Sequence, residues 1–180
     1  QHEHDVLKVL QHCGCVARLF EIGRDPEYQF LVMELLGDNL SELRRATAER
    51  KLSESTMAVI AVQTVSAIQA MHDEGFVHRD VKPSNFCIGL ADAGKSYVLD
   101  FGLARRWRTV SGEVRPARES ADFRGTCRYA SVHSHLSQEL SRRDDMWSLL
   151  YMLLELHQGD LPWHATKVHR KHHHSRQHPA

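Results

Sequence analysis

The sequence predicts an α+β fold, in which short strands stand before and between longer helices. Residues 53–74 repeat apolar side chains every three or four positions, which is typical of a helix with a buried face. Short β-prone runs lie on both sides of this stretch, and a second strongly apolar stretch follows at residues 146–156. Helical and strand-like periods therefore alternate along a single chain.

The elements before residue 53 are expected to be short. Residues 3–10 predict the end of a helix, with apolar side chains at helical spacing. The β-prone runs at 16–22 and 29–34 flank a Gly-Arg-Asp-Pro turn signal at 23–26, so they predict a hairpin. Residues 40–50 predict a helix with a charged outer face.

The longest helix is expected over residues 53–74. Ser53 is a suitable N-cap, and Gly75 is a suitable residue to end the helix. At about 1.5 Å per residue such a helix is about 30 Å long, enough to cross a small domain. Short strands are predicted after it, at residues 76–78, 86–88 and 97–99.

The C-terminal part combines an irregular segment with a buried helix. Residues 105–143 are polar and lack a clear period, which in a compact domain favours a functional loop. Residues 146–156 are apolar around most of a helical circumference, so a fully buried helix is expected there. The basic, histidine-rich tail at 164–180 predicts disorder.

Composition restricts the expected partners and compartment. Lysine plus arginine equal aspartate plus glutamate, 23 against 23, so no overall charge favours nucleic acid or an anionic membrane. No apolar run has the length of a membrane span, and no signal peptide is evident. The four cysteines lack the spacing of a disulfide scaffold, which favours a reducing, intracellular compartment.

Three residues near the first helix outline a metal site. His12, Cys13 and Cys15 offer an imidazole and two thiols within four positions. Zinc-finger spacing requires a second pair of ligands, and none follows at that spacing. The sequence alone therefore favours ordinary packing thiols beside a helix end.

The decisive stretch is HRDVKPSN at residues 78–85, followed by DFG at residues 100–102. Phosphoryl transfer from ATP needs a carboxylate that orients the attacking hydroxyl and accepts its proton, positive charge at the γ-phosphate, and oxygen ligands for magnesium. A lone DFG is usually a turn, and a lone HRD is usually a solvated loop. Both together, in this order and each after a strand-like run, indicate a phosphoryl-transfer site.

Each polar residue of these motifs has its own predicted role. Asp80 is the expected catalytic base, and Lys82 is expected to reach the transferred phosphate. Asn85 is the expected ligand of a second magnesium ion. Asp100 is the expected main magnesium ligand, beside Gly102 where the backbone must bend sharply. The expected cofactors are therefore ATP and Mg²⁺.

Several longer stretches carry a family resemblance: HRDVKPSNFCIG (78–89), DFGLARRW (100–107), GEVRPARESADFRGTCRYASVHSH (112–135), RRDDMWSLLYMLLEL (142–156) and GDLPW (159–163). On these residues the chain resembles the casein-kinase-one superfamily of protein kinases and, within it, most closely the tau-tubulin kinases. The resemblance covers about residues 3–163. Ser84 in the catalytic loop and the VRP stretch at 114–116 favour the tau-tubulin branch.

The resemblance implies a protein-kinase-like fold, mostly the helical large lobe with a truncated small lobe. Residues 1–37 would be a small-lobe remnant and hinge, 38–163 an incomplete large lobe, and 164–180 a tail. The adenine pocket implied by the resemblance has a gatekeeper, a hinge, a floor and a back wall. Met33 would be the gatekeeper, Glu34 to Leu36 the hinge, Cys87 the floor and Leu99 the back wall.

The resemblance also implies three supporting residues. Thr126 resembles the threonine that hydrogen-bonds the catalytic aspartate, and Asp145 resembles the buried aspartate that braces the catalytic loop. Glu3 occupies the position of the regulatory-helix glutamate that pairs with a strand lysine. Without the family resemblance, Glu3 would be expected to be a solvated helix residue.

Arg124 and Arg128 flank a Gly-Thr pair close to the expected position of the substrate hydroxyl. Guanidinium groups bind carboxylate and phosphate oxygens bidentately, so both arginines predict a preference for acidic or already phosphorylated flanks. The alternative is a solvated positive loop. Members of the resembled superfamily prefer such sites, which strengthens the prediction for Arg128.

The sequence departs from the family pattern in three places. No glycine-rich phosphate loop is present, and no strand lysine precedes Glu3. After Trp163 the sequence turns basic and histidine-rich where the family continues into further helices. The SVH triplet at 131–133 replaces the Ser-Ile-Asn-like triplet that this superfamily has in place of Ala-Pro-Glu. The chain is therefore expected to be a partial or mis-spliced kinase, or else a kinase-derived interaction module.

The predicted function is that of a serine/threonine kinase that transfers the ATP γ-phosphate to protein substrates. A non-catalytic, kinase-derived binding module is the alternative. The resemblance implies cytoskeletal substrates, and the expected location is the cytoplasm and also the nucleus. As it stands, the chain is expected to bind ATP weakly and to leave the apolar side chains of Leu149, Leu153 and Leu156 partly open.

Overall fold

The computed structural model describes residues 2–164. In chain order its helices and strands are α1 (His2–Leu10), η1 (Gln11–Cys13), β1 (Leu19–Arg24), β2 (Gln29–Met33), β3 (Leu36–Asn39), α2 (Leu40–Ala46), α3 (Glu54–Asp73), β4 (Phe76–Val77), η2 (Pro83–Asn85), β5 (Phe86–Gly89), β6 (Ser96–Val98), β7 (Arg105–Arg106), η3 (Cys127–Tyr129), α4 (Val132–His135) and α5 (Arg142–Gln158). The prediction of a disordered tail at 164–180 lies, except for His164, outside the described residues. The α+β class is confirmed.

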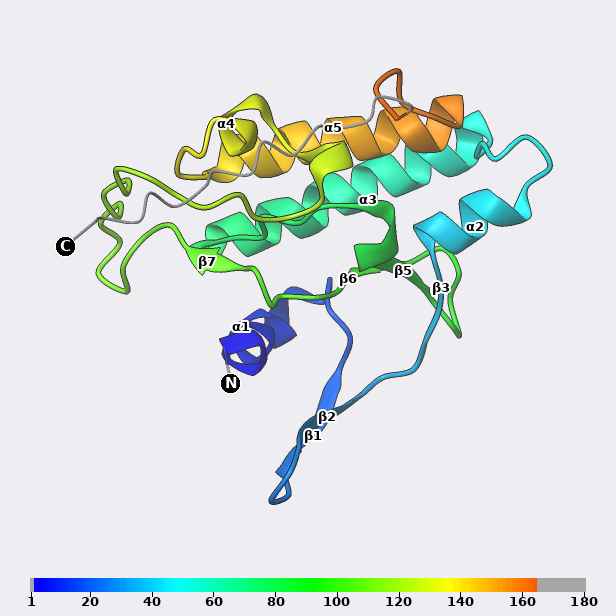
Figure 1. Cartoon of the computed structure of the whole chain (residues 1–180). Coiled ribbons are helices and arrows are strands. Elements are labelled where there is room, and N and C mark those ends of the chain that lie inside the picture. Colours follow the sequence, from blue (N-terminus) through cyan, green and yellow to red (C-terminus); the bar gives the residue numbers. More distant parts are fainter. Residues whose placement is uncertain (1, 165–180) are drawn as a thin grey trace.

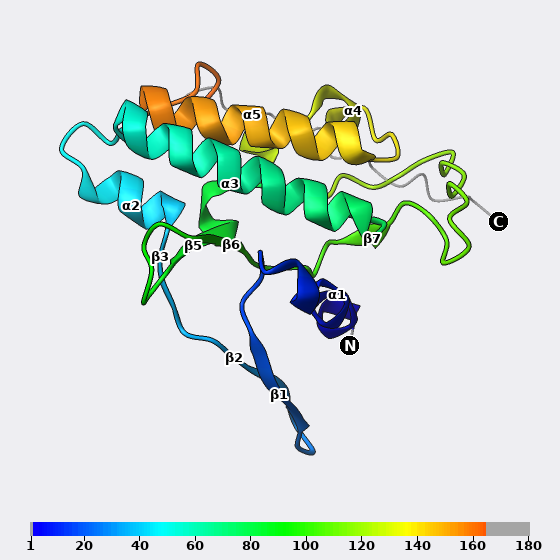
Figure 2. The same ribbon diagram turned by 180° about the vertical axis from the view of Figure 1, so that it is seen from behind.

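Helices α3 and α5 lie side by side along one side of the molecule, and the short strands lie beneath them (Figure 1). Seen from behind, the β1–β2 hairpin projects away from this helical layer, next to α1 (Figure 2). The strands form three small antiparallel groups: β1–β2, β3–β5–β6 and β4–β7. The predicted hairpin and the strands after α3 are thus confirmed, with small shifts in their bounds.

Local sequence signals determine where the two long helices begin or end. The Ser53 hydroxyl accepts a hydrogen bond from the Thr56 amide, so Ser53 caps α3 as predicted. Gly75 follows α3 with a positive φ of 84°, a conformation that ends a helix without strain only at glycine. At the start of α5, Ser141 and Asp144 form a reciprocal capping box.

The prediction for α5 was wrong about its burial. The side chains of Leu149, Met152 and Leu156 are buried, whereas Met146 and Leu150 are exposed. The reason is that α5 packs against α3 on one side, so only one face of this apolar helix is covered within residues 2–164. The sequence predicted that Leu149 and Leu156 would be partly open. Because of the packing against α3, both instead form part of the core.

Two further bounds differ from the sequence predictions. Helix α2 ends at Ala46 rather than near residue 50, because Thr47 turns into an extended conformation and its amide and hydroxyl both donate to the Arg44 carbonyl. The segment 105–143 is largely irregular, as expected, but it contains β7, η3 and α4. None of the described helices is both long enough and apolar enough to cross a bilayer.

Candidate active site

The loop between β4 and β5 is held by one buried carboxylate from α5. Asp145 is 2% exposed and accepts hydrogen bonds from the backbone amides of His78 and Arg79, each at 2.8 Å. Its Oδ2 also lies 2.8 Å from Nε2 of His72, near the end of α3. Arg79 has a positive φ of 69°, so the amides converge on Asp145 only because the loop backbone is in a rarely used conformation. These hydrogen bonds join the loop backbone to α5 at the residue for which the family resemblance implies a bracing role.

Arg79 links this loop to the segment after the DFG triplet. Its Nε donates to the Leu103 carbonyl at 2.7 Å. Burial first, and then the neighbouring guanidinium groups of Arg105 and Arg118, lower the pKa of Arg79. The arginine of the HRD motif is thus a bracing residue in this structure.

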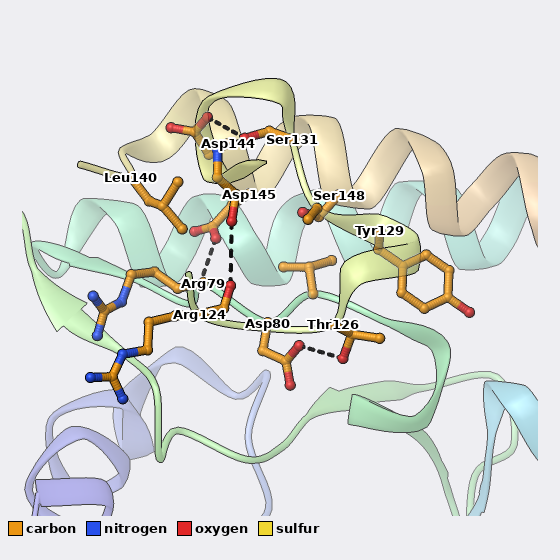
Figure 3. Close-up of a pocket in the computed structure, with 13 residues that line it drawn as sticks. Arg79, Asp80, Arg124, Thr126, Tyr129, Ser131, Leu140, Asp144, Asp145 and Ser148 are labelled. Carbon is orange, nitrogen blue, oxygen red and sulfur yellow. Dashed lines mark hydrogen bonds between the residues drawn. The ribbon is translucent and has the colours of Figure 1, made fainter. Parts of the chain in front are cut away.

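Three polar groups converge on buried Asp80. The Thr126 hydroxyl donates to Oδ1 at 2.8 Å, and the Lys82 ammonium lies 2.5 Å from Oδ2. The Asn85 amide nitrogen donates to the Asp80 carbonyl oxygen at 3.0 Å. Figure 3 shows the Asp80 carboxylate and the Thr126 hydroxyl pointing toward each other. The structure thus brings together all four residues that the sequence assigned to the catalytic group.

Gly125 makes the approach of Thr126 to Asp80 possible. Its φ is +91°, and a Cβ at this position would lie 2.5 Å from the Arg79 carbonyl oxygen. Only glycine allows the activation segment, which runs from the DFG triplet to the SVH triplet (100–133), to pass so close to the catalytic loop.

Asp100 stands next to this group on the following strand end. The Leu99 amide donates to the Asn85 carbonyl at 2.8 Å, and the His78 Nε2 lies 3.1 Å from the Leu99 carbonyl. The Asp100 carboxylate is exposed, and it accepts only the Gly102 amide, at 3.3 Å, among its hydrogen bonds within the described residues. Asp100 and Asn85 therefore project from two segments that are hydrogen-bonded to each other.

Asp100 and Asn85 supply the donor types that magnesium prefers. The amide nitrogen of Asn85 is used by the Asp80 carbonyl, which leaves its amide oxygen as the available ligand atom. A carboxylate and an amide oxygen are hard ligands suited to Mg²⁺. The residues present thus fit the ion that the motif implies.

Comparison with known proteins decides the family. Residues 1–179 match the protein kinase domain. The chain belongs to the protein kinase family. It is 55% identical over 164 residues to a Dictyostelium discoideum protein named a probable serine/threonine-protein kinase, covering 90% of this chain and 33% of the relative. It is 39% identical over 173 residues to a Caenorhabditis elegans protein named for casein kinase I, covering 94% of this chain and 51% of the relative.

These relatives confirm the protein-kinase-like fold and the likeness to serine/threonine and casein kinase I proteins. The chain spans about a third of the length of the first relative and about half of the second.

The predicted regulatory-helix glutamate contacts the DFG triplet. Glu3 Oε1 accepts a hydrogen bond from the Phe101 amide at 3.3 Å, and this contact docks α1 on the segment that carries Asp100. Phe101 itself is buried beside His78, with ring centroids 5.9 Å apart. The described residues place no lysine against Glu3, so its position rests on the DFG backbone.

The predicted adenine-pocket residues lie where the hairpin joins the three-stranded sheet. Met33 ends β2, and the Glu34 amide donates to the Arg18 carbonyl at 2.8 Å. Leu36 begins β3 opposite Gly89, while buried Cys87 lies in the neighbouring β5 and Leu99 follows β6. Leu36 and Cys87 therefore share one sheet, Leu99 comes directly after its third strand, and Met33 and Glu34 belong to the connection between this sheet and the hairpin.

The two predicted substrate arginines differ from each other. Arg124 is 53% exposed and lines the same cavity as Asp80 and Thr126, with Asp122 at 3.5 Å. Arg128 instead turns inward and pairs with the fully buried carboxylate of Glu155. This differs from the expectation of a free, substrate-facing Arg128, because the burial of Glu155 requires a positive charge beside it.

Glu155 organises a buried cluster that sequence reasoning missed. Besides Arg128, it pairs with Arg44 of α2 at 3.5 Å and accepts the phenolic hydrogen of Tyr129. Burial, and then Glu155, raise the pKa of Tyr129 well above its ordinary value. The signal in the sequence was one acidic residue inside the apolar run MLLEL.

The SVH triplet at 131–133, which differs from the triplet of the resembled superfamily, contacts α5. The Ser131 hydroxyl donates to Asp144 Oδ1 at 2.7 Å, and Nδ1 of His133 lies 3.0 Å from the same oxygen. Both side chains thus lie against the carboxylate that also caps α5. The triplet departs from the family pattern in sequence, yet it still joins the activation segment to α5.

Proposed function

We propose that this chain carries the phosphoryl-transfer machinery of a serine/threonine kinase, which moves the ATP γ-phosphate to hydroxyls of protein substrates. The observation that supports this proposal is the grouping of Thr126 and Lys82 on the two carboxylate oxygens of Asp80. A carboxylate held in this way has a fixed direction, and it can orient an incoming hydroxyl and accept its proton.

Each neighbour of Asp80 has a distinct task in this proposal. Thr126 fixes the carboxylate orientation through Oδ1. Lys82 places a positive charge within 2.5 Å of Oδ2, where it can also contact the negative charge of the transferred phosphate. Asn85 and Asp100 would hold magnesium, which when bound neutralises phosphate charge and aligns the phosphates for in-line attack.

The test is phosphate transfer to protein by a kinase domain that combines this chain with a glycine-rich loop and strand lysine. Asp80→Asn should lower the transfer rate by about 10²–10⁴-fold, the usual range for a positioned proton acceptor, with ATP affinity little changed. Asp73→Asn is the matched control, since Asp73 is exposed at the end of α3 and does not line the cavity that Asp80 lines. Equal rates for Asp80→Asn and the control would reject the proposed role.

A non-catalytic binding module is the alternative, because the sequence has no glycine-rich loop. A nucleotide thermal shift separates the two proposals. A shift by ATP that requires Mg²⁺ and is lost in Asp100→Ala supports the kinase. A chain that binds protein partners but shows no such shift after addition of a glycine-rich loop and a strand lysine supports the module.

We also infer a substrate class and a branch of the family. The VRP stretch at 114–116 favours the tau-tubulin branch, with cytoskeletal substrates in the cytoplasm and also the nucleus. Exposed Arg124, beside Asp80 in the same cavity, favours acidic or phosphorylated flanks on the substrate. Peptides with acidic, phosphorylated, neutral and basic flanks test this preference. If Arg124→Ala leaves their ranking unchanged, the arginine does not read the substrate.

A further inference from the structure

A group of metal-ligating side chains lies outside the candidate active site, where the first helix meets the end of α3. His12 and Cys13 belong to η1, directly after α1, and Glu74 is the C-terminal cap of α3. One donor atom from each of these residues lies within 4.8 Å of the other two. Glu74 is 62 positions from His12 in the sequence, so only the fold assembles the group.

The backbone holds these donors in place. Gly14 adopts a left-handed conformation with φ 64°, which ends η1 and turns the chain back. The Gln11 side chain then donates to the Ala17 carbonyl and accepts from the Leu19 amide. The Glu74 amide is bound to the Ala70 carbonyl at the end of α3. Both sides of the group therefore rest on ordered backbone rather than on a free loop.

Two of the three donor–donor distances agree with a shared tetrahedral ion, and the third, between the Cys13 thiol and the Glu74 carboxylate, is no more than 4.8 Å. Zinc binds imidazole nitrogen and carboxylate oxygen at about 2.0–2.1 Å and thiolate sulfur at about 2.3 Å, so tetrahedral donors are about 3.3 Å (N to O) and about 3.6 Å (N to S) apart. In the structure, Nε2 of His12 lies 3.1 Å from Oε1 of Glu74 and 3.6 Å from Sγ of Cys13. An ion can reach the group, because the His12 side chain is 64% exposed.

We propose that His12, Cys13 and Glu74 form a binding site for a zinc-type divalent transition-metal ion. Imidazole, thiolate and carboxylate are ligands that zinc accepts together, and the open side leaves a fourth position for water. The thiolate and carboxylate charges match the two positive charges of the ion.

Both thiols lie where their surroundings oppose deprotonation. Burial first, and then the Glu74 carboxylate, raise the pKa of Cys13. Burial and the neighbouring Cys13 raise the pKa of Cys15 to about 11. A metal ion would therefore bind Cys13 only with release of the thiol proton.

The position of the site gives the ion a structural consequence. The same first helix docks on the DFG segment through Glu3 and Phe101. Residues 76–77, which follow Glu74 and Gly75, form β4 and lead into the catalytic loop. A metal bound here would tie α1 to the end of α3 and so stabilise the placement of α1 against the large-lobe core.

Cobalt(II) tests the site, since it takes zinc positions and gives a near-ultraviolet charge-transfer band when a thiolate binds it. The C-terminal histidines cannot give this band, because residues 164–180 contain no cysteine. We expect one equivalent of Co²⁺ to produce the band and Zn²⁺ to displace it. Cys13→Ser should abolish the band, while His12→Ala and Glu74→Gln should each weaken binding at least 10-fold.

Cys127→Ser and Asp73→Asn are the matched controls, since neither residue contributes a donor to the group. Both variants should keep the band and the affinity. Zinc should also slow alkylation of Cys13 relative to Cys127 in the same molecule. The proposal is overturned if the unmodified chain gives no band, or if His12→Ala and Glu74→Gln bind cobalt as tightly as the unmodified chain does. The second outcome would leave His12 and Glu74 as a plain ion pair.

Discussion

The catalytic loop and the β1–β2 hairpin differ in the burial and the hydrogen bonding of their side chains. In the loop, buried polar groups such as His78, Asp80 and Asn85 all have hydrogen-bond partners. In the hairpin, large apolar side chains face solvent: Phe20 is 58% exposed and Tyr28 is 67% exposed. The two strands of the hairpin pair with each other, and only Leu19, Leu31 and Met33 of its strands are among the partly buried side chains that pack against the core.

This difference indicates that contacts of the catalytic loop contribute more to the folding free energy of the described chain than contacts of the hairpin do. A two-stranded hairpin is marginal by itself, whereas the loop is attached to a core that includes α3 and α5. Substitutions at the loop brace should therefore be costly, and equivalent substitutions in the hairpin should be nearly neutral.

Asp145→Ala should have the largest effect on stability. It removes the acceptor of the His78 and Arg79 amides and the partner of His72, all within 2.8 Å of a carboxylate that is almost fully buried. Loss of such a buried partner costs about 3–5 kcal/mol of unfolding free energy. The measurement is the urea midpoint at constant m-value. Asp122→Ala, at an exposed carboxylate, is the control and should shift the midpoint little.

Glu155→Gln should be the next most costly change, by about 2–4 kcal/mol. Glutamine keeps the shape and can still accept from Tyr129, but it leaves the guanidinium groups of Arg44 and Arg128 without a buried counter-charge. Thermal unfolding monitored by circular dichroism measures the loss. Adding Arg128→Met to Glu155→Gln should recover part of it. If Arg128→Met alone does not change stability, Arg128 is not bound to the core as described.

The loop and the hairpin also differ in how well the sequence predicts them. The grouping of Asp80, Lys82 and Asn85 could be predicted, because these residues lie within one short loop whose spacing fixes their relative positions. The contact of Thr126 with Asp80 came only from the family resemblance, since 46 positions separate the two residues.

Contacts between distant segments could not be predicted from periodicity. The apolar pattern of α5 shows that the helix is hydrophobic, but not which neighbour covers it, so Met146 and Leu150 were wrongly expected to be buried. Glu155 offered a signal within its apolar run, yet its arginine partners lie on other elements. The approach of Glu74 to His12 likewise depends on how α1 packs beside the end of α3.

The smallest expected effect comes from a matched pair of substitutions, Val98→Thr and Val32→Thr. Threonine has nearly the shape and strand propensity of valine, so the main change is one hydroxyl in place of a methyl group. Val98 in β6 is fully buried, and the new hydroxyl would lose water, which costs about 1–3 kcal/mol. Val32 in β2 is 41% exposed, so its hydroxyl stays hydrated and stability should change by less than about 0.5 kcal/mol. Urea midpoints of the two variants give the comparison directly. Equal losses at both positions would show that the hairpin belongs to the same cooperative unit as the core, with its apolar face covered in solution.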